Sequence, residues 1–211
     1  TSDNSGAKEL WRGPWAGISR TNWVMSNIDK SPRITDEKKT QYKGEAHFLR
    51  GLYYFNLVRL FGDVPWIEKQ QTASDNLMVK RTPKETVYEN IINDLKDAAE
   101  MLPAVYDNSS DIGRATKGAA FGLLAKVYLT QKRYKETLIA IDSVMDLNVY
   151  SLNRKYEWNF NDTRENGPES LFEVQYEKDV TAYAEFDILG QGAWHCLLYT
   201  SPSPRDSTSS R

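Results

Sequence analysis

The most strongly patterned stretch of the chain runs from Glu45 to Pro65 and reads EAHFLRGLYYFNLVRLFGDVP. Its apolar residues recur at three- and four-residue spacing, which predicts a helix over Glu45–Phe61. One face of this helix carries Ala46, Leu49, Tyr53, Leu57 and Leu60, and a second face carries Phe48, Leu52 and Phe55. A helix that is apolar over most of its circumference must be covered on several sides, so we expect the rest of the chain to pack around it.

Few polar side chains remain on this helix, and we expect them to be satisfied inside the protein or by close ion pairs. Arg50 and Arg59 are expected to pair with carboxylates such as Glu45 or Asp63. Asn56 lies on a crowded part of the helix, so we interpret it as an internal hydrogen-bonding group.

Capping signals place the boundaries of the N-terminal helices. Gly62 is typical of the left-handed residue that closes a helix, so the central helix should end just before it. Pro14 fits the first turn of an earlier helix that runs to about Asp29. Thr35 can cap the following helix, which can continue directly into Glu45–Phe61.

The segment Thr82–Leu102 has the clearest helix signals in the chain. Thr82 is expected to be the N-cap, with Pro83 at the first helical position and Glu85 completing a capping box. Pro103 should end this helix. Its apolar side chains follow at helical spacing: Val87, Tyr88, Ile91, Leu95, Ala98 and Leu102.

The next two helical patterns, 114–131 and 134–147, predict a tetratricopeptide-type hairpin. The large and small positions of that repeat are filled by Leu124, Ala125, Tyr128, Tyr134, Ile141 and Val144. Thr137 stands where such repeats usually have alanine. The helices 45–61 and 82–102 would form a second, degenerate unit with a long inserted loop.

The character of the chain changes after Tyr150. Asn166-Gly167-Pro168 is a turn signal, and Ser170–Tyr176 alternates apolar and polar residues, which predicts a half-buried strand. The sequence therefore predicts a mainly α fold of tetratricopeptide-like helical hairpins, with a small β or loop portion near the C-terminal end.

Composition narrows the classes of function. The 211 residues are 40% hydrophobic with a net charge of −2, which gives no reason to expect a nucleic-acid partner. With one cysteine and two histidines, we expect no internal disulfide and no metal site. The sequence shows no phosphate-binding loop and no nucleophile–base set, so we expect no catalytic residues and no enzymatic activity. Twelve tyrosines and six tryptophans are compatible with sugar stacking, although helix packing also uses aromatic residues.

The Glu45–Pro65 run resembles the SusD/RagB family of outer-membrane nutrient-binding lipoproteins, whose members carry a similar EA-FLR-LYYF-LV-LFGDVP run. The pattern of the Thr82–Leu102 helix, with the Pro103 that ends it, and the ESLFEVQY segment are also similar to the family. The resemblance covers roughly 11–176 and implies that the chain is an N-terminal fragment of such a protein.

This resemblance implies a lipoprotein on the extracellular face of a Gram-negative outer membrane, where it captures oligosaccharide or polysaccharide. The implied partner is a SusC-like TonB-dependent transporter, with no cofactor and with a lipid anchor that lies outside this fragment. The alternative function, which rests on the repeat pattern alone, is a tetratricopeptide-type scaffold that binds a protein or peptide in a groove lined by Tyr128 and Tyr134.

Four residues are candidates for carbohydrate contact: Trp11, Arg12, Trp15 and Trp66. The first three cluster near the start of a helix, where they would form either a sugar platform beside a guanidinium donor or the packing edge of the helix. Trp66 is the large aromatic residue of the long connection between the second and third helices, residues 62–81, and it would contact either a ligand or the helices. Packing is the favoured interpretation in both places.

The C-terminal segment Cys196–Arg211 does not belong to this pattern. It is rich in serine and proline and has no periodicity. We interpret it as translated adapter or vector sequence, because the resemblance stops near Ala193. We therefore expect one partial SusD-like helical domain over residues 1–193 and a non-native or disordered tail over 194–211. A chain that holds only part of the family fold should expose an apolar patch.

Overall fold

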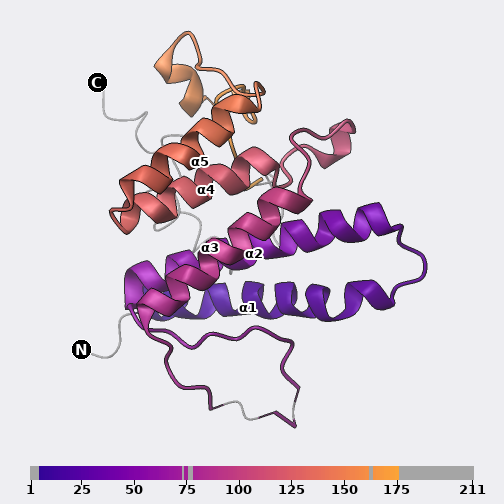
Figure 1. The fold of residues 1–211 in the computed structure, drawn as a ribbon, viewed down its shortest axis with the longest axis vertical. Helices are drawn as coiled ribbons and strands as arrows, with labels where there is room; N and C mark the ends of the chain where they lie inside the picture. Colours follow the sequence, from indigo (N-terminus) through magenta and orange to yellow (C-terminus); the bar gives the residue numbers. More distant parts are fainter. Residues whose placement is uncertain (1–4, 73, 76–77, 162–163, 176–211) are drawn as a thin grey trace, which may run out of the picture.

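The computed structural model describes residues 5–72, 74–75, 78–161 and 164–175. Five α-helices follow one another: α1 (Ser5–Asn27), α2 (Asp36–Phe61), α3 (Lys84–Met101), α4 (Lys117–Thr130) and α5 (Tyr134–Asp146). Short 3-10 helices lie at Ile28–Lys30 (η1), Ser109–Asp111 (η2) and Tyr156–Phe160 (η3). The predicted mainly α fold is confirmed (Figure 1).

The helices form a sequential stack. α1 and α2 lie side by side, α3 packs against α2, and α4 forms a hairpin with α5 at the other end (Figure 1). The core fills the space between α2, α3 and α4. Most of its largest fully buried side chains come from α2 and α3, together with Ile18 of α1: Phe48, Tyr54, Phe55, Leu57, Ile91, Ile92 and Leu95. None of the helices in the described residues is long and apolar enough to cross a membrane.

α2 is the central element, as its sequence predicts. It continues without interruption from Asp36, and the Thr35 side chain accepts a hydrogen bond from the Lys38 backbone N–H at 3.4 Å. Gly62 closes it with a φ of +69°, a left-handed value that suits glycine. The predicted buried face is wrong only at its end, where Leu60 is 49% exposed, because it is the adjacent Phe61 whose ring packs on Trp11 of α1.

α1 begins earlier than predicted, so that Pro14 lies inside the helix and not in its first turn. Proline removes one backbone donor and disfavours the interior of a helix. The turns before Pro14 nevertheless carry Trp11, whose ring lies 5.0 Å from that of Phe61 on α2. We attribute the longer helix to this packing, which the position of a proline alone does not reveal.

The predicted cap of α3 is wrong. Thr82 lies before the helix, where its N–H donates to the Val64 carbonyl at 3.0 Å and its hydroxyl accepts from the Trp66 N–H at 3.3 Å. The Lys84 N–H donates instead to the Asp63 carboxylate at 2.9 Å, so a residue from the far end of the connection caps α3. Tertiary pairing of Thr82 with the 64–66 segment therefore overrides the local capping pattern.

The predicted strand at Ser170–Tyr176 is also wrong over residues 170–175, where the described chain is irregular. Phe172 packs on Phe48 of α2 with ring centroids 4.9 Å apart. The alternation therefore reflects packing on a helix surface, since no neighbouring strand in the described residues could pair with this segment. Tyr176, the Ala193 boundary and the Cys196–Arg211 tail lie outside the described residues.

Candidate functional site

Three of the four candidate residues meet in one aromatic cluster. The Trp11 ring lies 5.3 Å from Trp15 and 5.0 Å from Phe61, in edge-to-face contacts. Trp15 lies 5.9 Å from Tyr54, and Tyr54 lies 4.1 Å from Trp66 at an interplanar angle of 31°. The cluster of these five residues joins α1, α2 and the long connection, and each ring contact contributes about 0.5–1.5 kcal/mol beyond area burial.

The three tryptophans are partly buried and pack against the hydrophobic core. Each therefore keeps part of its surface accessible while its ring supports the fold. Arg12 lies apart from the cluster: its side chain is 65% exposed and reaches Glu9 at 3.5 Å. The structure thus brings Trp11, Trp15 and Trp66 together, whereas Arg12 stands apart on the surface of α1 and pairs with Glu9.

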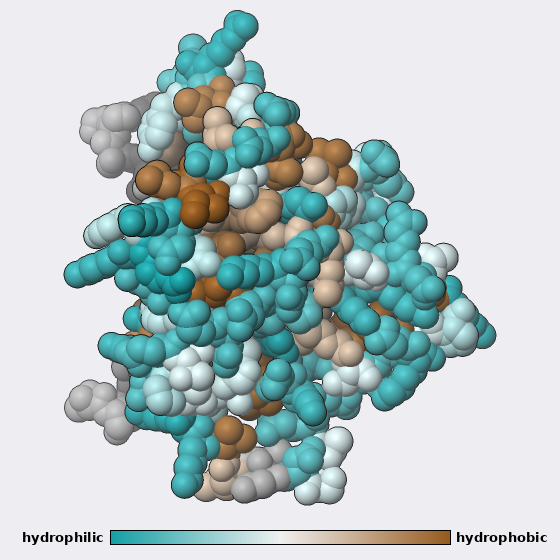
Figure 2. Space-filling model, viewed as in Figure 1, coloured by the Kyte–Doolittle hydropathy of each residue, from teal (hydrophilic) through white to brown (hydrophobic). Residues whose placement is uncertain are grey.

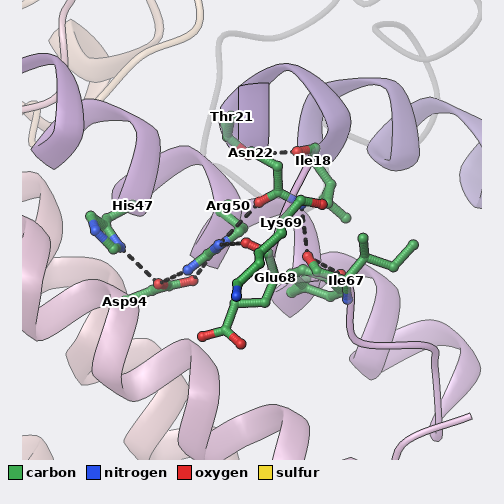
Figure 3. A network of polar contacts seen from close by, with 10 residues as sticks. Ile18, Thr21, Asn22, His47, Arg50, Ile67, Glu68, Lys69 and Asp94 are labelled. Carbon is green, nitrogen blue, oxygen red and sulfur yellow. Dashed lines mark hydrogen bonds and ion pairs between the residues drawn. The ribbon is translucent and has the colours of Figure 1, made fainter. Parts of the chain in front are cut away.

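A buried polar network lies beside this cluster (Figure 3). The Arg50 guanidinium donates to both carboxylate oxygens of Asp94, at 2.7 and 2.6 Å, and the two side chains are 6% and 5% exposed. It also donates to Asn22 Oδ1 and to the Glu68 carbonyl, each at 3.0 Å. The expected pairing of Arg50 with a carboxylate is confirmed, but the examples named for it, Glu45 and Asp63, are wrong, because Asp94 on α3 faces it directly.

This network connects every element around the site. Asn22 of α1 donates to the Ile67 carbonyl at 2.8 Å, and the Tyr54 hydroxyl accepts from the Ile67 N–H at 2.7 Å. The Arg50 guanidinium lies 5.5 Å from the centroid of the Trp66 ring, in a cation–π contact. The connection is thus held in one path, and the polar network meets the aromatic cluster at Trp66.

His47, Asp94 and Asp97 place their ligand atoms within 4.8 Å of one another, which is the spacing of a metal site. The chemistry of the group argues for an ion-pair network instead. His47 Nδ1 and the Arg50 guanidinium both reach Asp94, so its carboxylate is already occupied. The positive charge of Arg50 also opposes a cation at this point.

The other polar residues of α2 find partners that the sequence did not identify. Arg59 donates to Asn56 Oδ1 at 2.6 Å and lies over the Phe55 ring, and burial lowers its pKa. The predicted carboxylate partner of Arg59 is therefore wrong, and Glu45 pairs with Arg114 at 2.8 Å. Asn56 is only half satisfied, because its Nδ2 has no hydrogen-bond partner in the described chain.

Besides a hollow of about 520 Å³ beside Arg59 and Tyr88, two further hollows open near these groups. The first, about 210 Å³, lies between α1 and the connection. Its lining is formed by Trp15, Ile18, Ser19, Asn22, Ile67, Lys69 and Gln71. Because an indole ring and an aliphatic side chain adjoin amide and ammonium groups here, the lining offers both an apolar surface and hydrogen-bond donors.

The second hollow, about 280 Å³, lies between the α3–α4 connection and the chain that follows α5. Tyr106, Arg114 and Tyr150 contribute to its lining. The Tyr106 hydroxyl donates to the Ala115 carbonyl at 2.7 Å, and burial raises its pKa. The sequence did not identify this hollow, because its walls come from irregular segments with no periodic pattern.

The comparisons with protein families and with curated proteins point to the same family. Residues 1–129 match the SusD-like_3 family, which is described as starch-binding and associating with the outer membrane. A curated relative, SusD-like protein P25 of Formosa agariphila, is 26% identical over 182 residues, which are 86% of this chain and 34% of that protein. The chain therefore spans about a third of the length of this relative.

Solved structures show the same fold. A SusD-like carbohydrate binding protein from Bacteroides fragilis superposes with a TM-score of 0.77 and 30% identity over 84% of this chain and 34% of that chain. A laminarin binding SusD-like protein superposes with a TM-score of 0.73 and 29% identity over 79% of this chain and 37% of that chain. The helix stack is thus a fold already seen in larger proteins.

Proposed function

Because the chain belongs to the SusD-like family, described as starch-binding and associating with the outer membrane, we propose that it binds carbohydrate at that surface. The observation that carries this proposal is the family match over residues 1–129. The likeness to a carbohydrate-binding structure supports it. Since the chain spans about a third of its relatives, the proposal concerns the whole protein to which these residues belong.

The exposed edge of the aromatic cluster suits the contact that we propose. A sugar ring has an apolar face that packs on an aromatic ring and a rim of hydroxyls that accept hydrogen bonds. In this proposal Trp11 provides the ring, and the exposed Arg12 guanidinium provides donors on the same helix turn. Trp15 and Trp66 extend the aromatic surface and hold it against α2.

In this proposal the protein binds the sugar and does not react with it. The rigid helix stack holds the ligand and transfers it to a SusC-like TonB-dependent transporter, while a lipid anchor holds the protein on the extracellular face of the outer membrane. Binding of this kind needs no cofactor, and the net charge of −2 does not favour nucleic acid. The family resemblance supports the transporter and the anchor.

The second candidate function is a scaffold that binds a protein or peptide along the α4–α5 hairpin. One observation favours it, because Tyr134 is 61% exposed. The other residue expected to line such a groove, Tyr128, is only 5% exposed and belongs to the core. The hairpin therefore offers a peptide less aromatic surface than its sequence indicates, and we favour carbohydrate.

Affinity electrophoresis in gels that contain starch, laminarin or other polysaccharides tests the proposed function. We expect at least one polysaccharide to retard the chain, and the Trp11→Ala and Arg12→Ala variants to bind it more weakly. Loss of one aromatic contact should weaken binding roughly 2- to 10-fold. Trp23→Ala is the matched control, since Trp23 is a 56% exposed tryptophan farther along α1 and should bind normally.

Retardation by no polysaccharide, together with stable co-purification of a protein partner, would support the scaffold instead. If both variants bind normally, carbohydrate binding stands, but the binding site does not include Trp11 and Arg12. Circular dichroism of each variant shows whether a change in binding reflects a change in fold.

A further inference from the structure

The hollow of about 520 Å³ lies where three helices begin or end. Its walls come from the last turn of α2, the first turns of α3 and the end of α4. The edge of the molecule where the start of α3 and the turn between α4 and α5 lie is largely hydrophilic (Figure 2). The hollow is therefore a polar site between complete helices and not an apolar packing surface.

Arg59 lines this hollow without a carboxylate partner in the described residues. Its Nη2 donates to Asn56 Oδ1 at 2.6 Å and its Nε to the Phe55 carbonyl at 3.4 Å, so both acceptors lie on α2 itself. Burial lowers the pKa of Arg59, and burial together with the charge of Arg59 lowers the pKa of Lys126 on α4. The surroundings thus disfavour positive charge at a place that holds two cations.

Unpaired amide donors are the second feature of this region. Gln131 lines the hollow, and its buried Nε2 has no hydrogen-bond partner in the described chain. The same holds for Nδ2 of Asn56, the residue that accepts from Arg59. Because buried donors in folded proteins normally meet an acceptor, these groups indicate that the site lacks a hydrogen-bond acceptor.

The remaining charges around the hollow also favour an anion. Lys84 adds a second basic side chain to the wall, and its nearest carboxylate, that of Glu85, lies 3.9 Å away on the surface. The Asp63 carboxylate is already occupied, since the Lys84 backbone N–H donates to it at 2.9 Å. The start of α3 adds the partial positive charge of a helix N-terminus.

We propose that this hollow binds the acidic group of an anionic sugar, such as a uronic acid residue of a polysaccharide. Arg59 and Lys84 meet the carboxylate, Gln131 donates to a neighbouring oxygen, and the ring of Tyr88 packs on the sugar. The volume falls within the range of about 300–1,000 Å³ that is usual for small-molecule sites, which is more room than one acidic side chain fills. The inference rests on the proposed carbohydrate binding and adds a second contact and a sugar class to it.

An NMR titration of the whole 211-residue chain with glucuronate tests the proposal, with glucose as the uncharged match. We expect saturable shifts of the Gln131 side-chain amide, with glucuronate binding at least roughly 10-fold more tightly than glucose. Arg59→Met keeps the aliphatic contact with the Phe55 ring and removes the charge, so it should weaken glucuronate binding roughly 10- to 100-fold. Arg33→Met is the matched control, since Arg33 is an exposed arginine in the turn before α2 and should bind normally.

A second variant keeps every cation in place. Gln131→Glu puts a carboxylate into the wall of the hollow, where it competes with the sugar acid for Arg59 and should weaken glucuronate binding by a similar factor. Circular dichroism should show a native helix content for this variant. The test therefore does not depend on the folding of Arg59→Met.

Equal affinities for glucuronate and glucose, unchanged glucuronate binding in Arg59→Met and Gln131→Glu, or an equal loss in Arg33→Met would overturn the proposal. Absence of any glucuronate binding would also overturn it and would leave these cations to an acidic protein segment. Retardation of Arg59→Met by a neutral polysaccharide should stay normal. Failure of this inference is thus distinguishable from failure of the proposed function, which the Trp11→Ala and Arg12→Ala variants test.

Discussion

Arg50 is the residue on which the arrangement of the first three helices depends. A buried guanidinium is stable only when its donors are paired, and Arg50 pairs with Asn22 of α1, Asp94 of α3 and the Glu68 carbonyl. The sequence indicated that Arg50 needs a carboxylate partner. It could not identify Asp94, because that residue lies 44 positions away in a helix whose orientation no local pattern fixes.

The first prediction concerns this ion pair. Arg50→Met should lower the free energy of unfolding by about 3–5 kcal/mol, because it leaves the buried Asp94 carboxylate without its guanidinium partner and with only the His47 contact. Urea denaturation measures the change. The double variant Arg50→Met, Asp94→Leu should recover much of the loss, since no isolated charge remains. Arg12→Met, at an exposed position, should change stability by less than about 0.5 kcal/mol. A loss from Arg50→Met no larger than that of Arg12→Met would contradict the assigned role.

The second prediction concerns Tyr54. Burial raises the pKa of its hydroxyl above the ordinary value of 10.0, so the folded state holds this proton more tightly than the unfolded state. The resulting stability is complete below pH 10 and is lost as the pH rises above it. We expect alkaline unfolding, measured by circular dichroism, to begin above pH 10 and to be less steep in Tyr54→Phe. An equally steep transition in that variant would show that Tyr54 does not contribute.

The candidate site shows what residue types alone can reveal. Trp11, Trp15 and Trp66 could be selected because tryptophan is large and suits both packing and ligands. Their contact through Tyr54 and Phe61 could not be foreseen, because it depends on how α1 and the connection lie against α2. The packing interpretation, favoured for both places, agrees with the partial burial of these rings.

At the scale of elements, hydrophobic periodicity predicted the helices well and their ends less well. α2, α4 and α5 follow their patterns because each has a continuous apolar face. The ends of α1 and α3 differ because contacts between distant segments decide them. The prediction of a strand at Ser170–Tyr176 was wrong over 170–175 for a related reason. Alternation of apolar and polar residues indicates a half-buried segment, but it does not specify whether a strand or a helix covers that segment.

The third prediction tests the cap of α3. Asp63→Ala should cost about 0.5–2 kcal/mol, because it leaves the Lys84 N–H without its acceptor at the start of the helix. Glu85→Ala removes the residue that the local capping pattern selected and should cost less than about 0.5 kcal/mol. Chemical denaturation of the two variants in parallel separates these assignments. A larger loss of stability from Glu85→Ala than from Asp63→Ala would instead support the capping box that the sequence pattern predicts.

At the scale of the whole molecule, the described residues form a helix stack built around α2. The buried network of Arg50 and the aromatic cluster fix α1 and the connection to that stack, so exposed residues of α1 have a rigid support. The chain matches the SusD-like family, and a solved SusD-like relative about three times as long contains the same frame. The sequence alone led to this family through the Glu45–Pro65 run, which is also the structural centre of the fold.

Isothermal titration calorimetry with an oligosaccharide cut from the polysaccharide that retards the chain most strongly tests the central claim directly. Chromatography of the sugar afterwards completes the measurement. We predict saturable binding with the oligosaccharide recovered intact, since the proposed site holds a sugar without reacting with it. Absence of binding heat for every oligosaccharide, or recovery of shortened products, would contradict the account.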